Sequence, residues 1–183
     1  MPDHRLKPLT PLGNSAPQTD AIGPVTLIEN VDWALASLAT RRGRDGDVQR
    51  AALALDIALP GPGHASDTAL WIGPDQWIIE APYARHEDFA AYLKPAFGDA
   101  ASITDQTDAW VRFDLSGTDL HALFEIVCNL DTRSMIPGHA TRTVIEHLGC
   151  YVRCRNTGFT ILGARSSAKS LHHALITAAR SAY

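Results

Sequence analysis

The sequence lacks several features that mark common classes of protein. It has no apolar run near the roughly 18 residues of a membrane-spanning helix, and no signal-peptide core follows Met1. Its three cysteines, an odd number, fit a reducing compartment better than a disulfide framework. Basic residues do not dominate, since 16 Lys and Arg stand against 20 Asp and Glu. Nucleic acids bind clustered positive charge, so we expect no nucleic-acid partner. Together, these absences predict a soluble, cytoplasmic chain without a membrane partner.

The sequence also lacks the short motifs of the commonest active sites. GxGxxG, GxxxxGK[ST], GxSxG and HExxH are all absent. Asp105 and Asp108 bracket a turn, where a carboxylate pair could perform acid/base work, although turn formation is the commoner role of aspartate. Cys150 and Cys154 would lie about 13 Å apart on one strand, too far to share a zinc ion, so burial is the preferred interpretation. We therefore predict no catalytic, cofactor-binding or metal-binding residue in this chain.

The clearest structural pattern present is the stretch from Ile103 to Asn129. Two sets of residues alternate there and predict a strand, with the apolar set facing the core. The sets are Val111, Phe113 and Leu115 on one face, and Trp110, Arg112 and Asp114 on the other. Apolar residues then recur at helical spacing: Leu120, Leu123, Phe124, Val127 and Cys128. The stretch thus reads as strand, turn, strand and amphipathic helix, with the outer strand face free to meet a neighbouring helix or another subunit.

The remaining elements predict an internal repeat. A strand at 25–30 and a helix at 32–42 match the strand and helix at 109–129. A hairpin and helix at 69–98 match those at 150–180, after a further strand at 141–147. Each half then has the order β-α-β-β-α, a split βαβ or ferredoxin-like arrangement. We expect an α+β fold in which two such halves, about 25–100 and 101–183, pack into a single domain at 25–183.

Residues 1–24 contain five prolines, which fix φ and remove backbone donors. We expect this segment to form a proline-rich extended arm that does not readily join a sheet or helix. It is either a solvated tail or an arm that lies on a partner surface, anchored by Leu6, Leu9 and Leu12.

Tryptophan provides the candidate binding surface. Two tryptophans flank the turn of the hairpin at 69–80, and a third lies on the outer face of the central strand beside an arginine. Tryptophan and arginine are enriched where protein interfaces derive most of their binding energy, but tryptophan is equally common in cores. The candidate subunit interface comprises Trp71, Trp77, Trp110 and Arg112.

Several pieces of the chain, taken in order, resemble a known family. They are LWIGPDQW at 70–77, ITDQTDAWVRFDLSG at 103–117, the segment from Cys128 to Asp131 leading to Pro137-Gly138 and Arg142-Thr143, and ARSSAKSL at 164–171. Together they look like the gamma subunit of bacterial heterotetrameric sarcosine oxidase, over most of residues 25–180. That subunit is similar in fold to the folate-binding domain of aminomethyltransferase, the T-protein of the glycine cleavage system. The shared segment here runs from Leu115 to Gly138.

The resemblance implies a non-catalytic structural subunit of a multisubunit flavoenzyme. Such complexes oxidatively demethylate sarcosine to glycine, pass the one-carbon unit to tetrahydrofolate or release formaldehyde, and produce hydrogen peroxide. The partner alpha, beta and delta subunits are expected to hold the cofactors, which are FAD, FMN, NAD, tetrahydrofolate and zinc. This chain is expected to bind no cofactor. The alternatives are an independent folate-binding one-carbon protein with a pocket between its halves, a gamma-like subunit of a related N-methyl amino acid dehydrogenase, and an assembly factor of the same fold.

Overall fold

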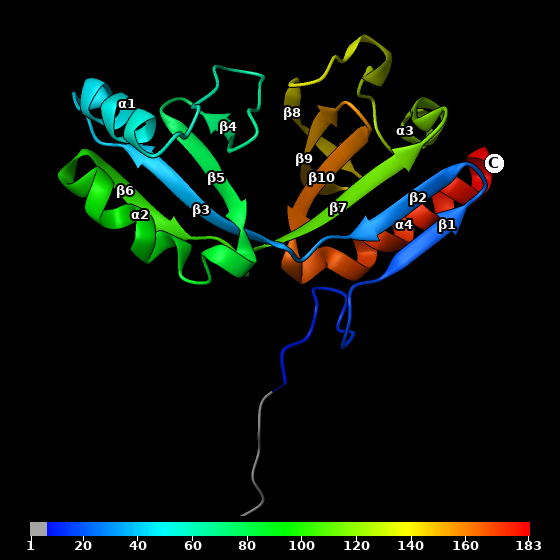
Figure 1. Ribbon diagram of the computed structural model, residues 1–183. Helices are drawn as coiled ribbons and strands as arrows, with labels where there is room; N and C mark the ends of the chain where they lie inside the picture. Colours follow the sequence, from blue (N-terminus) through cyan, green and yellow to red (C-terminus); the bar gives the residue numbers. More distant parts are fainter. Residues whose placement is uncertain (1–6) are drawn as a thin grey trace, which may run out of the picture.

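A computed structural model describes residues 7–183 as two antiparallel sheets, each with two helices against one face (Figure 1). Sheet A has the strand order β1-β2-β7-β10-β9-β8, and sheet B has the order β4-β5-β3-β6. The strands are β1 Thr19–Ile22, β2 Val25–Glu29, β3 Trp33–Thr40, β4 Ala69–Gly73, β5 Gln76–Pro82, β6 Ala101–Asp105, β7 Trp110–Gly117, β8 Ala140–Ile145, β9 Leu148–Arg155 and β10 Gly158–Ala164. The helices are α1 Asp45–Ala54, α2 Phe89–Phe97, α3 Leu120–Val127 and α4 Ala168–Ala182.

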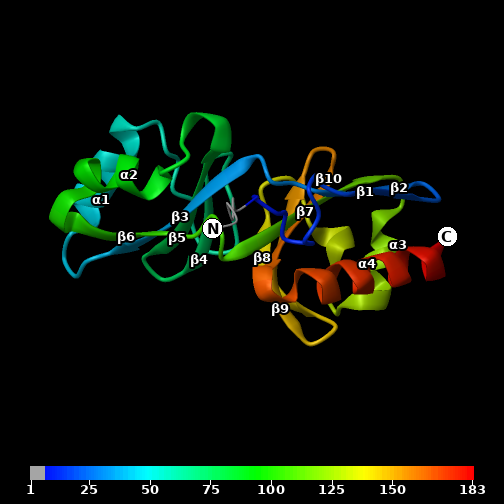
Figure 2. The ribbon, with the colours of Figure 1, turned by 90° about the horizontal axis from the view of Figure 1, so that it is seen from below.

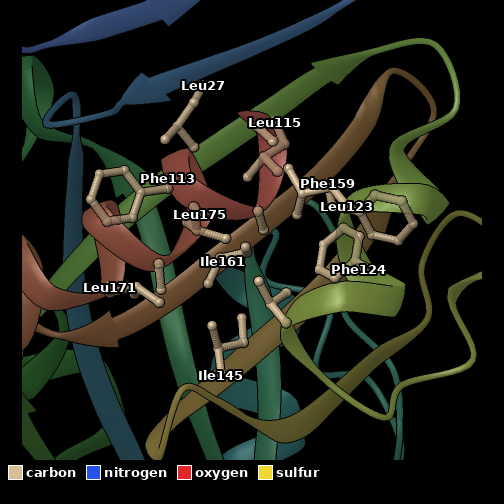
Figure 3. Close-up of a cluster of buried hydrophobic side chains, with 14 of the residues drawn as sticks. Leu27, Phe113, Leu115, Leu123, Phe124, Ile145, Phe159, Ile161, Leu171 and Leu175 are labelled. Atoms are coloured by element: carbon tan, nitrogen blue, oxygen red, sulfur yellow. The ribbon is translucent and has the colours of Figure 1, made fainter. Parts of the chain in front are cut away.

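The larger core lies between sheet A and the helices α3 and α4 (Figure 3). The alternation predicted for β7 is confirmed, because Val111, Phe113 and Leu115 are all buried in this core. The stripe predicted for α4 is buried as well: Leu171, Ala174, Leu175, Ala178 and Ala179. The α3 stripe is buried up to Val127, where the helix ends, and Cys128 follows in extended conformation. Period-two strands and period-3.6 helices therefore meet along the faces that their sequences indicate.

The smaller core lies between sheet B and the helices α1 and α2. The hairpin β4–β5 and the helix α2 agree with the sequence, and α2 ends at Gly98 as its pattern indicates. Phe89, Leu93 and Phe97 of α2 pack on Ile79 of β5 and Ile103 of β6. A bilayer-spanning helix is absent from the described part of the chain, since no helix there combines the necessary length and apolarity.

The segment predicted as a helix at 32–42 is instead the strand β3, at the centre of sheet B. Ala34, Ala36 and Leu38 face the helices of this half, whereas Leu35 faces sheet A. The strand pairs with β5 on one side and β6 on the other. Because the helix preference of alanine and leucine is worth only tenths of a kcal/mol per residue, two complete hydrogen-bonded ladders outweigh it.

The two sheets divide the chain differently from the expected halves at 25–100 and 101–183. The strand β2 pairs with β7 in sheet A, although it precedes all of sheet B in the sequence. The strand β6 pairs with β3 in sheet B, although it follows residue 100. The chain therefore crosses between the sheets twice, at 30–32 and at 106–109.

Part of the proline-rich arm is folded onto the rest of the chain. The prediction that this arm stays out of the sheets is wrong for Thr19–Ile22, which form β1 and pair with β2. Leu12 is buried in the larger core, and Leu9 is exposed, while Leu6 lies outside the described residues. The backbone N–H groups of Leu12 and Gln18 donate to the buried carboxylate of Glu29, at 2.8 and 3.0 Å. The arm thereby reaches the region where the two sheets meet (Figure 2).

Candidate functional site at the junction of the two sheets

The faces of the sheets that carry no helices are turned toward each other and meet at a junction (Figure 1). Leu35, Leu70 and Ile78 of sheet B lie there against Leu162 and Ala140 of sheet A. Two backbone hydrogen bonds add to this contact, from the N–H of Ala65 to the carbonyl of Gly138 at 2.8 Å and from that of Ala140 to the carbonyl of Gly63 at 2.9 Å. The junction thus combines apolar packing with main-chain pairing.

Charged residues enter the junction because they alternate with core residues along their strands. On β7, Arg112 and Asp114 alternate with Val111, Phe113 and Leu115. Arg153 on β9 likewise lies between Val152 and Cys154, which belong to the larger core. Period two turns these polar side chains away from the helices and toward the other sheet.

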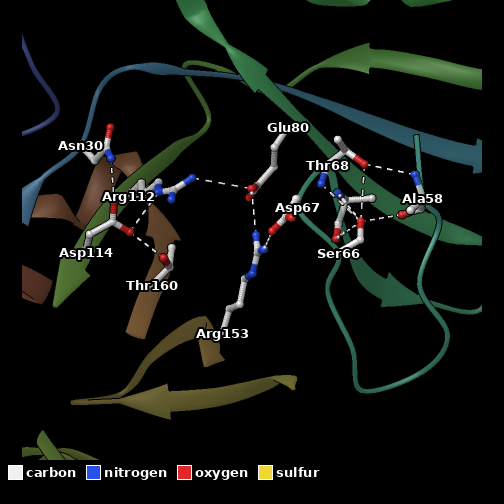
Figure 4. A network of polar contacts seen from close by, with 11 residues as sticks. Asn30, Ala58, Ser66, Asp67, Thr68, Glu80, Arg112, Asp114, Arg153 and Thr160 are labelled. Carbon is white, nitrogen blue, oxygen red and sulfur yellow. Dashed lines mark hydrogen bonds and ion pairs between the residues drawn. The ribbon is translucent and has the colours of Figure 1, made fainter. Parts of the chain in front are cut away.

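Glu80 of β5 is the centre of the resulting charge network (Figure 4). Its side chain is 1% exposed, and its Oε2 accepts a hydrogen bond from Nη1 of Arg153 at 3.2 Å. Nη1 of Arg112 lies 3.6 Å from the same oxygen. The side chains of the two arginines are only 8% and 4% exposed. One carboxylate of sheet B therefore contacts two buried guanidinium groups of sheet A and balances one of their two positive charges, which makes it the principal electrostatic contact between the sheets.

Asp114 completes the sheet A side of this network. Its Oδ2 accepts a hydrogen bond from Nδ2 of Asn30 at 2.6 Å, and its Oδ1 accepts from the Thr160 hydroxyl at 2.5 Å and from Nε of Arg112 at 3.1 Å. Burial raises the pKa of Asp114, but the charge of Arg112 and these hydrogen bonds outweigh that effect, so the pKa lies below its ordinary value of 3.8. The guanidinium of Arg112 also lies over the ring of Trp33, with 4.4 Å from Cζ to the ring centroid.

This lowered pKa makes a prediction about acid stability. A carboxyl group whose pKa is lower in the folded than in the unfolded state stabilises the fold above the unfolded value, and that contribution disappears as pH falls through the folded pKa. We expect the free energy of unfolding, measured by urea denaturation between about pH 5 and pH 2, to fall below pH 4. Asp114→Asn should flatten this acid dependence, while Asp99→Asn, which alters a side chain 93% exposed, should leave it unchanged. Identical acid profiles for the wild type and Asp114→Asn would contradict the assignment.

Two openings flank the network. Beside Arg112 is the arm-side cleft, about 400 Å³ in volume, lined by the arm and by Trp33, Trp110 and Tyr83 among others. Beside Arg153 is a second opening of about 280 Å³, the Arg153 pocket. Its lining residues are Ala65, Asp67, Pro137, Gly138, Arg153, Cys154, Arg155, Asn156 and Thr157.

The structure places the four residues predicted to form a subunit interface in two separate pairs. Trp110 and Arg112 both line the arm-side cleft, and the indole N–H of Trp110 donates to Oε1 of Gln106 at 3.2 Å. Trp71 and Trp77 are cross-strand partners in sheet B, on the face toward its helices. Trp77 is buried and donates from Nε1 to the carbonyl of Pro60 at 2.8 Å, whereas Trp71 is half-buried. The interface role of the four residues stays a prediction, with Trp77 and Arg112 largely engaged inside the chain.

The other candidates from sequence have structural roles. Asp105 accepts the backbone N–H of Thr107 at 2.8 Å and so forms a turn, and the exposed Asp108 pairs with Arg165 at 3.1 Å. Burial raises the pKa of the Cys150 thiol to about 11, which keeps it protonated at neutral pH. Within residues 7–183, no group of three or more His, Cys, Asp or Glu side chains has an arrangement that could hold a metal ion.

Sequence reasoning missed Glu80 and Arg153, the residues that join the sheets. A signal was present, because Glu80 is the single charged residue in the strand QWIIEAP, which is otherwise apolar except at its first position. A charge within an apolar strand indicates a buried ion pair, since an unpaired buried charge is too costly to keep. Its partner could not be identified, because Arg153 lies 73 residues further along the chain.

Comparisons with known proteins identify the fold. No protein-family model matches this chain, and no curated protein matches its sequence. The fold is similar to that of a chain in the heterotetrameric sarcosine oxidase from Corynebacterium sp. U-96 in complex with pyrrole 2-carboxylate. The TM-score is 0.76 and the sequence identity 22%, over 90% of this chain and 88% of that chain.

A second similar structure is the glycine cleavage system aminomethyltransferase T from Bartonella henselae. It matches with a TM-score of 0.63 and 13% identity, over 86% of this chain but 49% of that chain. The predicted mixed α+β fold of the aminomethyltransferase type is thereby confirmed.

Proposed function

We propose that this chain is a structural subunit, the gamma subunit, of an oxidase of the heterotetrameric sarcosine oxidase type. The observation that carries the proposal is the extent of the fold similarity, which spans 90% of this chain and 88% of a chain of such an enzyme. The aminomethyltransferase, in contrast, is about twice as long as the part that this chain matches. A match that spans most of both chains fits the role of a subunit of such a complex better than that of a reduced enzyme.

The proposed complex oxidatively demethylates sarcosine to glycine, with transfer of the one-carbon unit to tetrahydrofolate or release of formaldehyde, and with production of hydrogen peroxide. Its alpha, beta and delta subunits hold the FAD, FMN, NAD, folate and zinc. This chain contributes a folded body in which the buried charged groups at the junction are mostly paired with one another. A related complex that acts on another N-methyl amino acid would use this chain in the same way, because the substrate site lies in the partners.

We also interpret the two sheets as two copies of one split βαβ unit. The strand orders β4-β5-β3-β6 and β9-β10-β7-β2 support this interpretation, because each places a hairpin beside a central strand and then an outer strand. In both units the central strand is followed in sequence by a helix, α1 after β3 and α3 after β7. The outer strand β6 is the last strand of its unit in the sequence, whereas the outer strand β2 is the first strand of its unit and precedes all of sheet B. The chain therefore crosses between the sheets once after β2 and once after β6.

The proposal predicts a stoichiometric complex. When the chain is co-expressed with candidate alpha, beta and delta subunits, we expect it to elute with them in size-exclusion chromatography, in a peak with flavin absorbance. Trp71→Ala should weaken this assembly because it removes aromatic surface of the candidate interface, whereas Tyr92→Ser, which alters an exposed aromatic residue on α2, is the matched control. A chain that elutes as a monomer beside an assembled and active complex of the other three subunits would rule out the proposal.

The arm-side cleft favours a second candidate, an independent folate-binding one-carbon protein. The cleft offers about 400 Å³ beside Trp33 and Trp110, which is enough for a small ligand. Its charged lining fits folate poorly, however, because four carboxylates face two arginines there and the glutamate tail of folate is itself anionic. These residues are Asp32, Glu87, Asp105 and Asp108 against Arg112 and Arg165. Calorimetry of the isolated chain with tetrahydrofolate separates the two candidates, since micromolar binding would favour the second.

A further inference from the structure

The Arg153 pocket contains more donor capacity than the protein itself uses. Nε of Arg153 and Nη1 of Arg155 are both buried and have no hydrogen-bond partner within residues 7–183. Arg153 as a whole is 7% exposed. Leaving a charged donor buried and unpaired is costly, so such atoms usually indicate a ligand, an ion or ordered water. Two of them in residues that line the same pocket require an explanation.

The strand β9 places the two guanidinium groups together. Arg153 and Arg155 are two residues apart on one strand and therefore extend from the same face. The pKa of Arg153 lies below its ordinary value, chiefly because the side chain is buried. The carboxylate of Glu80 raises the pKa, and repulsion from the charge of Arg155 lowers it further. Two positive charges close enough to repel each other create a local field that attracts an anion, although the whole chain has a net charge of −4.

The carboxylate of Asp67 shows where an anion can approach. Its Oδ1 lies 3.4 Å from Nη2 of Arg153, a long contact for a charge-assisted hydrogen bond. The Asp67 side chain is fully exposed, so solvent screens this pair and competing anions can reach the same guanidinium. Glu80 compensates one positive charge through Nη1 of Arg153. Asp67 therefore holds Arg153 only weakly, and Arg155 adds a further positive charge.

We propose that the Arg153 pocket is a binding site for a small oxyanion ligand, a carboxylate or a phosphate, held by Arg153 and Arg155. The volume of about 280 Å³ suits a small metabolite or an acidic side chain presented by another molecule. Asn156 and Thr157 at the β9–β10 turn supply neutral polar groups, and Ala65 and Pro137 supply apolar wall. Arginine suits both ligand types because its planar donors match carboxylate and phosphate oxygens. The site is separate from the arm-side cleft and does not depend on the proposed function.

Calorimetric titration of the full chain tests the proposal, with inorganic phosphate in one series and succinate in another, at constant ionic strength set with sodium chloride. We expect saturable one-to-one binding in at least one series, and the tighter ligand identifies the preferred anion. Arg155→Gln should weaken binding roughly tenfold or more, because it removes a charged hydrogen-bond donor to the anion. Asp67→Asn should instead tighten binding by a few fold, because it removes a competing carboxylate.

The matched control is Arg142→Gln on the neighbouring strand β8, which removes the same charge from an exposed position outside the pocket. It should leave the binding constant within about twofold of the wild type, since exposed charges contribute little. Thermal denaturation of each variant checks that the fold is retained. The proposal is overturned by the absence of saturable binding to the wild type, by an unchanged constant in Arg155→Gln, or by an equal loss in Arg142→Gln.

Discussion

Replacing Glu80 with glutamine should lower the free energy of unfolding by about 3–5 kcal/mol, the usual cost of removing one partner from a buried ion pair. Glutamine keeps the size and shape of the side chain but removes the charge that compensates Arg153 at 3.2 Å and Arg112 at 3.6 Å. Both guanidinium groups would remain buried without a counter-charge from sheet B. Because the network joins the two sheets, we expect the Glu80→Gln substitution to weaken the junction as a whole. Chemical denaturation followed by circular dichroism measures the effect.

The surface pair Arg133–Glu125 provides the control for Glu80. Its Nε–Oε1 distance of 2.9 Å is shorter than either contact of Glu80, but both side chains are about 60% exposed. Solvent screens such a pair, so Glu125→Gln should cost only about 0–1 kcal/mol. Comparable losses in the two variants would show that burial does not determine the strength of these pairs, and would remove the basis for treating Glu80 as the link between the sheets.

Gly158→Ala should be the second strongly destabilising substitution. Gly158 begins β10 with a φ of +142°, and a Cβ atom there would lie 1.9 Å from the carbonyl oxygen of Leu115 on β7. The unfavourable φ costs about 1–3 kcal/mol, and the forced separation of two paired strands adds about 1–3 kcal/mol more. We therefore expect a loss of roughly 2–6 kcal/mol in the free energy of unfolding. Urea denaturation of purified protein, or loss of soluble expression, would report it.

Gly43→Ala separates the two causes. Gly43 also has a positive φ, +75°, but a Cβ atom there would meet nothing within 4 Å. This variant should therefore show only the conformational cost, of about 1–2 kcal/mol. The difference between the two alanine variants reports the steric contribution of the close approach between β7 and β10, together with the extra cost of a φ of +142° over one of +75°. If Gly158→Ala were no worse than Gly43→Ala, the strands would have to separate easily, contrary to the packed arrangement of this core.

The parts of the fold that sequence reasoning predicted correctly are those with a local periodic signal. Phe113 and its neighbours on β7 alternate so regularly that the core face is evident without any knowledge of the rest of the chain. The same holds for the helix stripe around Leu171 and Leu175 in α4. The segment at 33–40 failed because its apolar residues satisfy both periods, and only the pairing with β5 and β6 selects the strand.

The candidate site was predictable only in part. Arg112 was identified as an outward-facing residue of β7, and the two surfaces considered for it were a neighbouring helix and another subunit. In the structure it meets Glu80 of the other sheet and Trp33 instead. Arg153 and Arg155 carried no distinguishing signal in sequence, since arginines near a strand end are usually solvated. Their significance comes from burial and from donors left without partners.

The sequence by itself determined which residues face a core in elements with one clear period, such as β7 and α4, since hydrophobic periodicity acts within one element and needs no partner. It also indicated the α+β class and the absence of common catalytic motifs. Only the tertiary structure decided how β2 and β6 are exchanged between the sheets, and that the outer face of β7 meets the same chain. The physical reason is that strand pairing and ion pairing depend on groups brought together from distant positions, as Glu80 and Arg153 are. No local pattern specifies which partner satisfies a buried hydrogen-bonding group or charge.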